Sequence, residues 1–503
     1  MKKAASVKRW AYVLPVAACF LSVGTTLYAA LVNEDSGAHW AVWMCAALMA
    51  ALGITAALFA VRGWGAERRY PVCALLLGLL YLTALTPLSV PDEGHHYQTA
   101  YELSNVLLLR ADKDRGESAD FDYSDFPLHH NTAWGYSRIA RDLTAPAGES
   151  ESVPIPQPRD CSYFLMYLPQ ALGLALGRLL GLNFIWKFWL GRLCNLLFYV
   201  LCTAWAIRLV PRFKALFFLV ALAPMSMQQA ASFSYDAFIN ALSLLLLALL
   251  LRAMLEGDRP ALAASVAVNV LLTPAKLVYY PLAALALLIP EWRFASKRAR
   301  WGYLLALFVL PLLFLLPFRL GFLAATAVDT GSSLNWEGGH NYTLSFLLSH
   351  PAQTAKMFAV TGLASGTHWL KCAVGYLMSG LSLELYEWIP LLYIALLALA
   401  GLRREQDAPG LGAVERGVLC ASALAVIALV MLTMSLAWTS DTSGVVQGIQ
   451  GRYFIPILPL LFLLPHGDTL VLRRDIDKEL MLAGCLLNVL ALARIVDRTL
   501  MNL

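Results

Sequence analysis

The residues that could do chemistry in this sequence fall into four short polar groups. The first is the stretch from Pro91 to Tyr97 (Pro-Asp-Glu-Gly-His-His-Tyr), where two carboxylates stand beside two imidazoles at the end of an apolar run. Such a group can act as a general base or bind a metal ion. If a helix begins here, Asp92 and His96 share one of its faces. Asp92, Glu93 and His96 are therefore candidate catalytic residues, although an Asp after a Pro also fits an ordinary helix N-cap.

The second and third groups add a carboxylate and a lysine. Asp236 precedes an apolar run, so it is either a further catalytic carboxylate or a plain N-cap of the next helix. Asn240 continues the same face one helical turn later. Lys276 follows Pro274 between the apolar runs 261–275 and 277–290. Its ammonium group either binds a phosphate as a point charge or extends to the membrane interface.

The fourth group is the stretch from Gln447 to Pro456 (Gln-Gly-Ile-Gln-Gly-Arg-Tyr-Phe-Ile-Pro). Arg452 is its strongest residue, because a guanidinium binds phosphate or carboxylate with paired hydrogen bonds. Gln450 and Tyr453 flank it, and the glycines let the backbone approach a ligand. We expect these three residues, with Lys276, to hold a phosphate group. The alternative is a helix-start anchor with interfacial aromatic residues.

Metal binding is the other chemistry that these groups suggest. Asp92 and Asp236 are candidate ligands of a hard divalent cation such as Mg²⁺ or Mn²⁺. The pair His129-His130 could join the first group in a zinc site, but no spacing typical of zinc ligands supports this. No Walker loop and no Gly-x-Gly-x-x-Gly fingerprint is present, so the sequence indicates no nucleotide site.

The elements that must position these groups are membrane helices. Of the 503 residues, 59% are hydrophobic and 14% are charged, against roughly a quarter charged in soluble domains. The mean hydropathy is +0.63, and no soluble core of this size buries so much apolar surface. We predict an all-α integral membrane protein with about 13 transmembrane helices, in a range of about 11 to 14. This hydrophobicity excludes a soluble enzyme. A nucleic-acid partner is also excluded, because the net charge of +5 comes from basic residues in short loops that set membrane orientation.

The pattern of apolar runs and basic loops divides this single membrane domain into five sections. They are three N-terminal spans (1–90), a first outer loop with interfacial helices (91–188), a central span bundle (189–318), a second outer loop (319–387) and C-terminal spans (388–503). Basic residues cluster in alternate loops, which places the N-terminus in the cytoplasm by the positive-inside rule. All four polar groups then face outward.

Two segments of the outer loops are expected to form helices that do not simply cross the bilayer. Segment 163–181 is expected to lie on the outer face or to dip into it, and the amphipathic stretch 344–378 to lie at the interface. Within the first segment, the repeats Gly173-x-x-x-Gly177 and Gly177-x-x-x-Gly181 indicate close helix packing.

In this order, the four groups resemble one bacterial family. The resemblance rests on Pro-Asp-Glu-x-x-His at 91–96, on Asp236 at the start of a later span, and on Gln-Gly-Arg-Tyr-Phe-x-Pro at 450–456. It covers about residues 70–470. Members of this family are multispanning membrane proteins of unassigned function, and they are grouped with the C-type (GT-C) glycosyltransferases.

The resemblance implies a GT-C-like fold and a place in the bacterial cytoplasmic membrane with the active face outward. Such enzymes move a sugar from a polyprenyl-phosphate donor to an envelope glycan or lipid acceptor. By position, Asp92 with Glu93 matches their base or metal-binding residue, and Asp236 matches their second acidic residue. Lys276 lies where some relatives carry a lysine near the lipid phosphate. The chain departs from the pattern in one respect. Three spans precede its acidic loop, whereas the proven enzymes usually have a single span before that loop.

Two other functions stay open at the level of the sequence. A transporter or flippase of a lipid-linked saccharide would need charged residues deep inside its spans, whereas the charges here cluster at span ends. A non-catalytic subunit of an envelope-assembly complex would tolerate substitution of the outer carboxylates.

Overall fold

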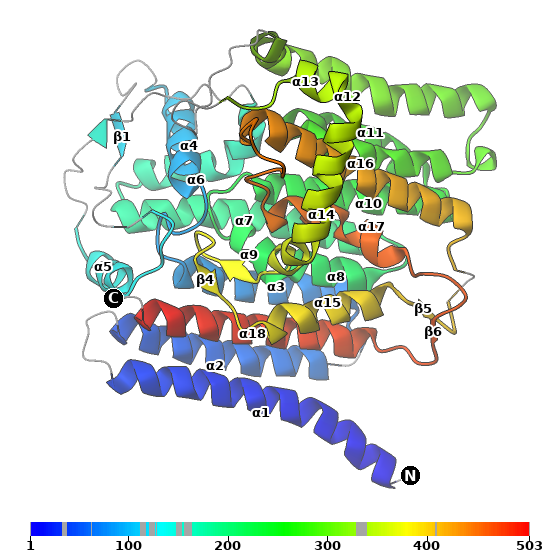
Figure 1. Ribbon diagram of the computed structural model, residues 1–503. Coiled ribbons are helices and arrows are strands. Elements are labelled where there is room, and N and C mark those ends of the chain that lie inside the picture. Colours follow the sequence, from blue (N-terminus) through cyan, green and yellow to red (C-terminus); the bar gives the residue numbers. More distant parts are fainter. Residues whose placement is uncertain are drawn as a thin grey trace.

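The computed structural model describes residues 2–32, 38–61, 63–110, 117–119, 126, 128–146, 153–154, 163–327, 340–407 and 410–501. This part of the chain is mainly helical (Figure 1). Its strands are short and form three two-stranded sheets. The prediction of an all-α protein agrees with this architecture.

Seven helices in the described chain are long and apolar enough to cross a bilayer, so the protein is embedded in a membrane. They are, or lie within, α1 (Lys2–Val32), α2 (Ala38–Ala60), α7 (Phe184–Leu209), α10 (Asp236–Glu256), α12 (Lys297–Ala327), α16 (Ala413–Ala437) and α18 (Asp477–Met501). Each coincides with one of the apolar runs that predict spans, near 11–32, 41–61, 189–207, 236–255, 301–318, 417–438 and 480–497.

The other predicted spans are helical but shorter, interrupted or more polar. They are α3 (Ala66–Ala84), α8 (Lys214–Leu222) with α9 (Pro224–Ala230), α11 (Arg259–Ala275), the 3₁₀ helix η2 (Leu277–Leu288), α15 (Trp388–Gly401), and η4 (Gly451–Ile457) with α17 (Leu458–Leu463). The structure therefore shows seven full-length candidate spans among the predicted ones.

Proline and one extended residue explain where these runs break. Pro224 begins α9 directly after the end of α8, because proline cannot donate the backbone hydrogen bond that would continue the first helix. Lys276 is extended, with φ −160° and ψ 99°, and separates α11 from η2, which confirms the predicted break after Pro274. Pro281 and Pro456 lie inside the 3₁₀ segments η2 and η4. Non-α backbone at membrane depth is tolerated where protein covers it or where it lines a cavity.

The remaining elements lie between the spans. They are α4 (Glu93–Leu107), β1 (Glu117–Ala119), α5 (Ala133–Asp142), β2 (Val153–Pro154), η1 (Phe164–Tyr167), α6 (Leu168–Leu179), η3 (Glu291–Arg293), α13 (Leu344–Ser349), α14 (Pro351–Ala373), β3 (Leu377–Met378), β4 (Leu383–Glu384), β5 (Arg403–Arg404) and β6 (Val471–Leu472). Strands β1 and β2, and β3 and β4, pair antiparallel, whereas β5 and β6 pair parallel. In Figure 1, α4 and α14 run across the direction of α1, α2 and α18.

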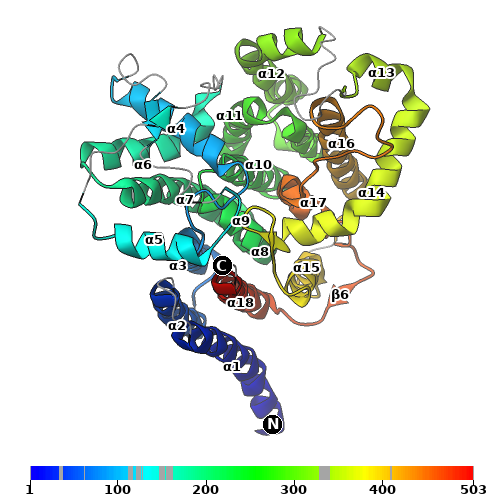
Figure 2. The same ribbon diagram turned by 60° about the vertical axis from the view of Figure 1, so that its left-hand side comes forward.

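The core is built around α10, whose apolar window is 83% buried. It packs against α7, α11 and η2. At one edge of the molecule, α18 lies between the body and the pair α1 and α2 (Figure 2). This arrangement places the first residues of α10 in the interior, next to the 3₁₀ segments η2 and η4.

Glycines set the contact between α6 and α7. A Cβ on Gly173 would lie 2.3 Å from the carbonyl oxygen of Leu190, and one on Gly177 would lie 2.9 Å from Lys187. The predicted packing role of this pair is confirmed. Gly181 differs, because a Cβ there would meet nothing and its φ of +63° instead suits the end of the helix. The prediction of packing for the second repeat is therefore wrong at that residue.

Substituting Gly173 by Leu should destabilise the protein, because the new side chain cannot fit against the α7 backbone. We expect a loss of about 1–3 kcal/mol, the usual cost of overpacking. Thermal unfolding of the detergent-solubilised protein measures it. Gly53→Leu is the control, because a Cβ on Gly53 of α2 meets nothing within 4 Å. Equal melting temperatures for the two variants would contradict the packing assignment.

Candidate functional site

Asp92 stands at the N-terminus of α4 but does not cap it. Its side chain accepts no hydrogen bond from the helix, and its backbone is left-handed, with φ 59° and ψ 9°. Asp is one of the few residues that tolerate this conformation. The carboxylate instead forms an ion pair with Arg452, with 2.7 Å between Oδ2 and Nη2. Asp92 thus occupies the N-cap position of α4 without the side-chain hydrogen bond of an ordinary cap.

Asp236 is the first residue of α10, and its carboxylate also faces cations. Oδ2 lies 3.4 Å from Nε of Arg452, and Oδ1 lies 3.7 Å from Nζ of Lys276. The N-cap position belongs to Tyr235, which makes no side-chain cap. The structure thus brings together Asp92, Asp236, Lys276 and Arg452, which are far apart in the sequence.

Arg452 lies in η4 between the two carboxylates, with its side chain 4% exposed. A guanidinium has five N–H donors, and buried donors are normally all satisfied. Here Nη1 is buried without a hydrogen-bond acceptor among the described residues. Nε faces Asp236 at 3.4 Å but makes no hydrogen bond in the described structure. Arg452 therefore keeps buried donors for a further acceptor.

Lys276 follows the last residue of α11, and its ammonium lies among aromatic rings. Nζ is 4.2 Å from the ring centre of Tyr453, 5.8 Å from that of Tyr235 and 5.9 Å from that of Tyr279. Cation–π contacts of this kind stabilise a charged ammonium. The side chain is 22% exposed and points to Asp236, so it is held by the site rather than extended freely to an interface.

His96 lies one turn into α4 and is buried against two tyrosines. Its Nδ1 is 2.8 Å from the hydroxyl of Tyr167, and its ring packs edge-on against Tyr235 with 4.9 Å between centroids. Burial lowers the pKa of His96 to about 4, against the opposing charge of Asp92. Partial burial alone would raise the pKa of Asp92, but the charge and the hydrogen bond of Arg452 outweigh it and lower that pKa. At neutral pH, His96 is neutral and Asp92 is charged.

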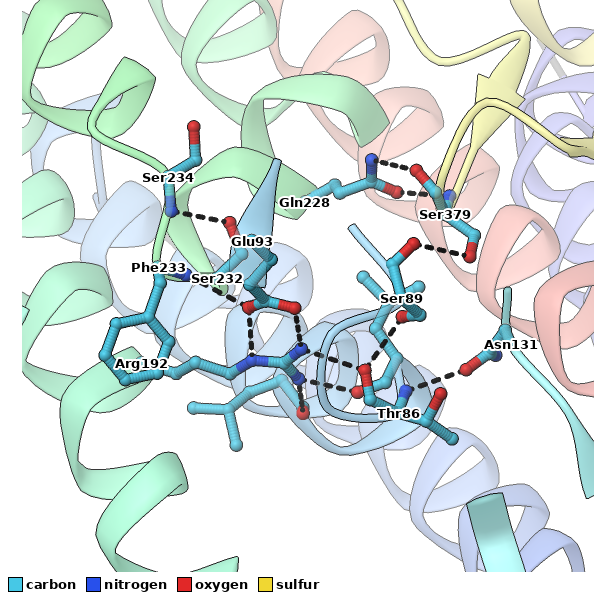
Figure 3. A network of polar contacts seen from close by, with 12 residues as sticks. Thr86, Ser89, Glu93, Asn131, Arg192, Gln228, Ser232, Phe233, Ser234 and Ser379 are labelled. Atoms are coloured by element: carbon cyan, nitrogen blue, oxygen red, sulfur yellow. Dashed lines mark hydrogen bonds and ion pairs between the residues drawn. The ribbon is translucent and has the colours of Figure 1, made fainter. Parts of the chain in front are cut away.

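Glu93 lies in a buried network of polar contacts with Arg192 (Figure 3). Its carboxylate accepts hydrogen bonds from Nε and Nη2 of Arg192 at 2.9 and 2.7 Å, and from the backbone N–H of Phe233 at 3.1 Å. Both side chains of the ion pair are 0% exposed. Arg192 was missed from the sequence, although a charged residue inside the apolar run of α7 is itself a signal.

The comparison with known families adds one finding. A model of the family described as predicted membrane protein (DUF2142) matches residues 75–461, which is more than half of the chain. The chain belongs to the DUF2142 family. None of the curated proteins and none of the solved structures matches it. All four polar groups lie within the part of the chain that the DUF2142 model covers.

In this DUF2142 protein, the two carboxylates predicted to bind a divalent cation face cationic side chains. In the part of the chain that the structure describes, no group of three or more His, Cys, Asp or Glu side chains could hold a metal ion. The described residues thus do not assemble the zinc ligands suggested for His129 and His130. Between Asp92 and Asp236, where a divalent cation was expected, the guanidinium of Arg452 lies instead.

Gln450 and Tyr453 flank Arg452 as the sequence suggested. Oε1 of Gln450 is buried without a hydrogen-bond partner among the described residues. The carbonyl oxygen of Tyr453 accepts a hydrogen bond of 2.9 Å from the hydroxyl of Tyr279. This bond ties η4 to η2, so the segments that carry Arg452 and Lys276 are fixed to each other.

The low pKa of His96 predicts a pH-dependent stability. In the unfolded chain its pKa is about 6.5, so between that pH and about 4 the unfolded state binds more protons than the folded state. The stabilisation is complete above pH 6.5 and is lost as the pH falls to about 4, with a size on the order of 3 kcal/mol. Thermal unfolding at several pH values should show a smaller loss for His96→Asn than for the wild type. The exposed His350 provides the control His350→Asn, and equal pH slopes in all three proteins would contradict the assignment.

Proposed function

We propose that this protein is a GT-C-like glycosyltransferase of the bacterial cytoplasmic membrane. It would transfer a sugar from a polyprenyl-phosphate donor to an envelope glycan or lipid acceptor on the outer face. One observation carries the proposal: a buried guanidinium, Arg452, is held between two carboxylates and keeps the donors of Nη1 free of acceptors among the described residues. A phosphate oxygen is the acceptor that such a group binds best.

The charges around Arg452 favour an anionic ligand. Two helices, α4 and α10, begin at the carboxylates that contact it, and the N-terminal end of a helix carries a partial positive charge. The charges of Asp92 and Asp236 offset those of Arg452 and Lys276. The helix ends then leave a positive balance, which a single phosphate group would complement.

In the proposed reaction, the acceptor hydroxyl oxygen forms a bond to the anomeric carbon of the sugar, and the bond from that carbon to the phosphate oxygen breaks. The electron pair leaves with the phosphate, whose charge Arg452 and Lys276 stabilise. Asp92 accepts the hydroxyl proton, because its carboxylate is charged and its side chain is 51% exposed. Asp236 orients both cations.

Arg452 links the two halves of this reaction. Its Nη2 donates to Asp92, so the guanidinium restrains the base until a ligand binds to the same guanidinium. A phosphate bound at Nη1 would draw charge away from Asp92 and raise the affinity of that carboxylate for a proton. The donor would thus prepare the base that acts on the acceptor.

The direct test compares envelope glycans and lipid-linked sugars by mass spectrometry in the wild type, a deletion strain, and the deletion strain carrying Asp92→Asn at matched expression. We expect one glycan residue to disappear, and its polyprenyl-phosphate donor to accumulate, in both altered strains. The control is Asp468→Asn, because Asp468 is an exposed partner of Arg403 far from the site. Full restoration by Asp92→Asn would contradict the proposal and favour a transporter or a non-catalytic subunit.

The phosphate role of Arg452 predicts a binding defect. Replacing it by Lys keeps one charge but removes the planar fork, so geranyl phosphate should bind the purified protein at least tenfold more weakly. Isothermal titration calorimetry in detergent measures this affinity. The control Arg494→Lys alters a different ion pair, the partly exposed pair of Arg494 and Asp497. If Arg452→Lys and Arg494→Lys bind geranyl phosphate as the wild type does, Arg452 does not hold the phosphate.

A further inference from the structure

The buried ion pair of Glu93 and Arg192 is fully satisfied. The guanidinium of Arg192 makes five hydrogen bonds: two to the Glu93 carboxylate, two from Nη1 to the carbonyls of Leu82 and Leu85, and one from Nη2 to the carbonyl of Thr86. These match its five N–H donors. Burying two charges is costly unless every donor finds an acceptor, and here that condition is met. No donor of Arg192 is left for a ligand.

The pair connects the two segments that lead to the site carboxylates. The carbonyls that Arg192 binds lie in the last turn of α3 and directly after it, where a helix leaves its acceptors without partners. Glu93 directly follows Asp92 in the chain. Its Oε1 also accepts the N–H of Phe233, three residues before Asp236. One carboxylate thus holds the backbone before both acidic site residues.

A chain of hydrogen bonds continues from this pair to other parts of the fold (Figure 3). Thr86 accepts from the hydroxyl of Ser89 at 2.8 Å, and Ser89 accepts from that of Ser379 at 3.0 Å. Ser379, which follows β3, makes two hydrogen bonds with the side chain of Gln228 in α9. Asn131 binds the backbone N–H of Thr86 at 2.7 Å. The turn before Asp92 is therefore held from several sides.

We propose that Glu93 and Arg192 are positioning residues for the site. Their ion pair fixes the left-handed backbone of Asp92 and the segment before Asp236, so that both carboxylates face Arg452. A left-handed residue other than glycine carries a strain that its surroundings must offset, and this network supplies the restraint. The sequence-based assignment of Glu93 to catalysis is replaced by this role. The use of the positioned carboxylates in sugar transfer rests on the proposed function, whereas the positioning itself does not.

Hydrogen–deuterium exchange of the full-length protein in detergent tests the restraint without any ligand. The variants are Glu93→Gln, which keeps the size of the side chain, and Arg192→Lys. We expect backbone amides in 90–97 and 231–240 to exchange at least tenfold faster in both. Unchanged exchange of these segments in Glu93→Gln would overturn the proposal, whatever Arg192→Lys does.

Arg404→Lys is the matched control. Like Arg192, Arg404 binds carbonyls at a helix end, those of Leu399 and Leu402, and pairs with an acidic residue, Asp477. This substitution should destabilise its own region without changing exchange in 90–97 and 231–240. Equal acceleration of these segments by the control would also overturn the proposal, because general loosening would then explain the effect.

Binding of geranyl phosphate, measured well below the unfolding temperature, separates positioning from general stability. Glu93→Gln should bind this probe at least tenfold more weakly than the wild type, and Arg404→Lys within twofold of it. Wild-type affinity in Glu93→Gln would overturn the positioning role for the site. If the wild type itself does not bind the probe, the phosphate site of the proposed function fails, while the exchange result still decides the restraint.

Discussion

A guanidinium buried inside a membrane protein must be neutralised by groups that the fold brings to it. Arg452 is neutralised by two carboxylates whose positions in the chain lie far from it and from each other. To bring them together, α4 and α10 must both begin at the same point, and η2 and η4 must replace regular helices with 3₁₀ turns. The tyrosines around Lys276 and the hydrogen bond from Tyr279 to η4 also connect these four segments.

Two buried arginines in this chain differ in how their guanidinium donors are satisfied. All five N–H donors of Arg192 make hydrogen bonds, to one carboxylate and three carbonyls. Arg452 is almost as buried but leaves Nη1 without an acceptor in the described part of the chain. An unmet buried donor costs free energy, and the phosphate of the proposed function would supply the missing acceptor. In the proposed account, Arg192 stabilises the fold around Arg452.

Much of the candidate site and of the helical fold could be predicted from the sequence. Carboxylates, a lysine and an arginine at the ends of apolar runs are expensive in a bilayer, and four such residues, at 92, 236, 276 and 452, do meet in the structure. Proline chemistry predicted the break at Lys276 correctly. Hydropathy predicted the seven long spans, but it could not distinguish complete spans from the short helices that share their composition.

The other features of the site depend on contacts between distant segments, and a single sequence does not reveal such contacts. The role of Glu93 could not be predicted, because its partner is 99 residues away in another helix. The contact of Arg452 with Asp92 and Asp236 could not be predicted for a related reason: two carboxylates suggest a cation, but the sequence does not say that an arginine from η4 lies between them. Likewise, Asp tolerates a left-handed backbone, but the sequence does not reveal the contacts of Asp92 with Arg452 and of Glu93 with Phe233 that accompany it.

The most direct test of the central claim is a high-resolution electron cryo-microscopy structure of the protein with bound geranyl phosphate. The account predicts phosphate density within hydrogen-bond distance of Nη1 of Arg452 and close to Lys276, with Asp92 and Asp236 still at the site. Phosphate density elsewhere, with Nη1 bonded only to protein groups, would contradict it.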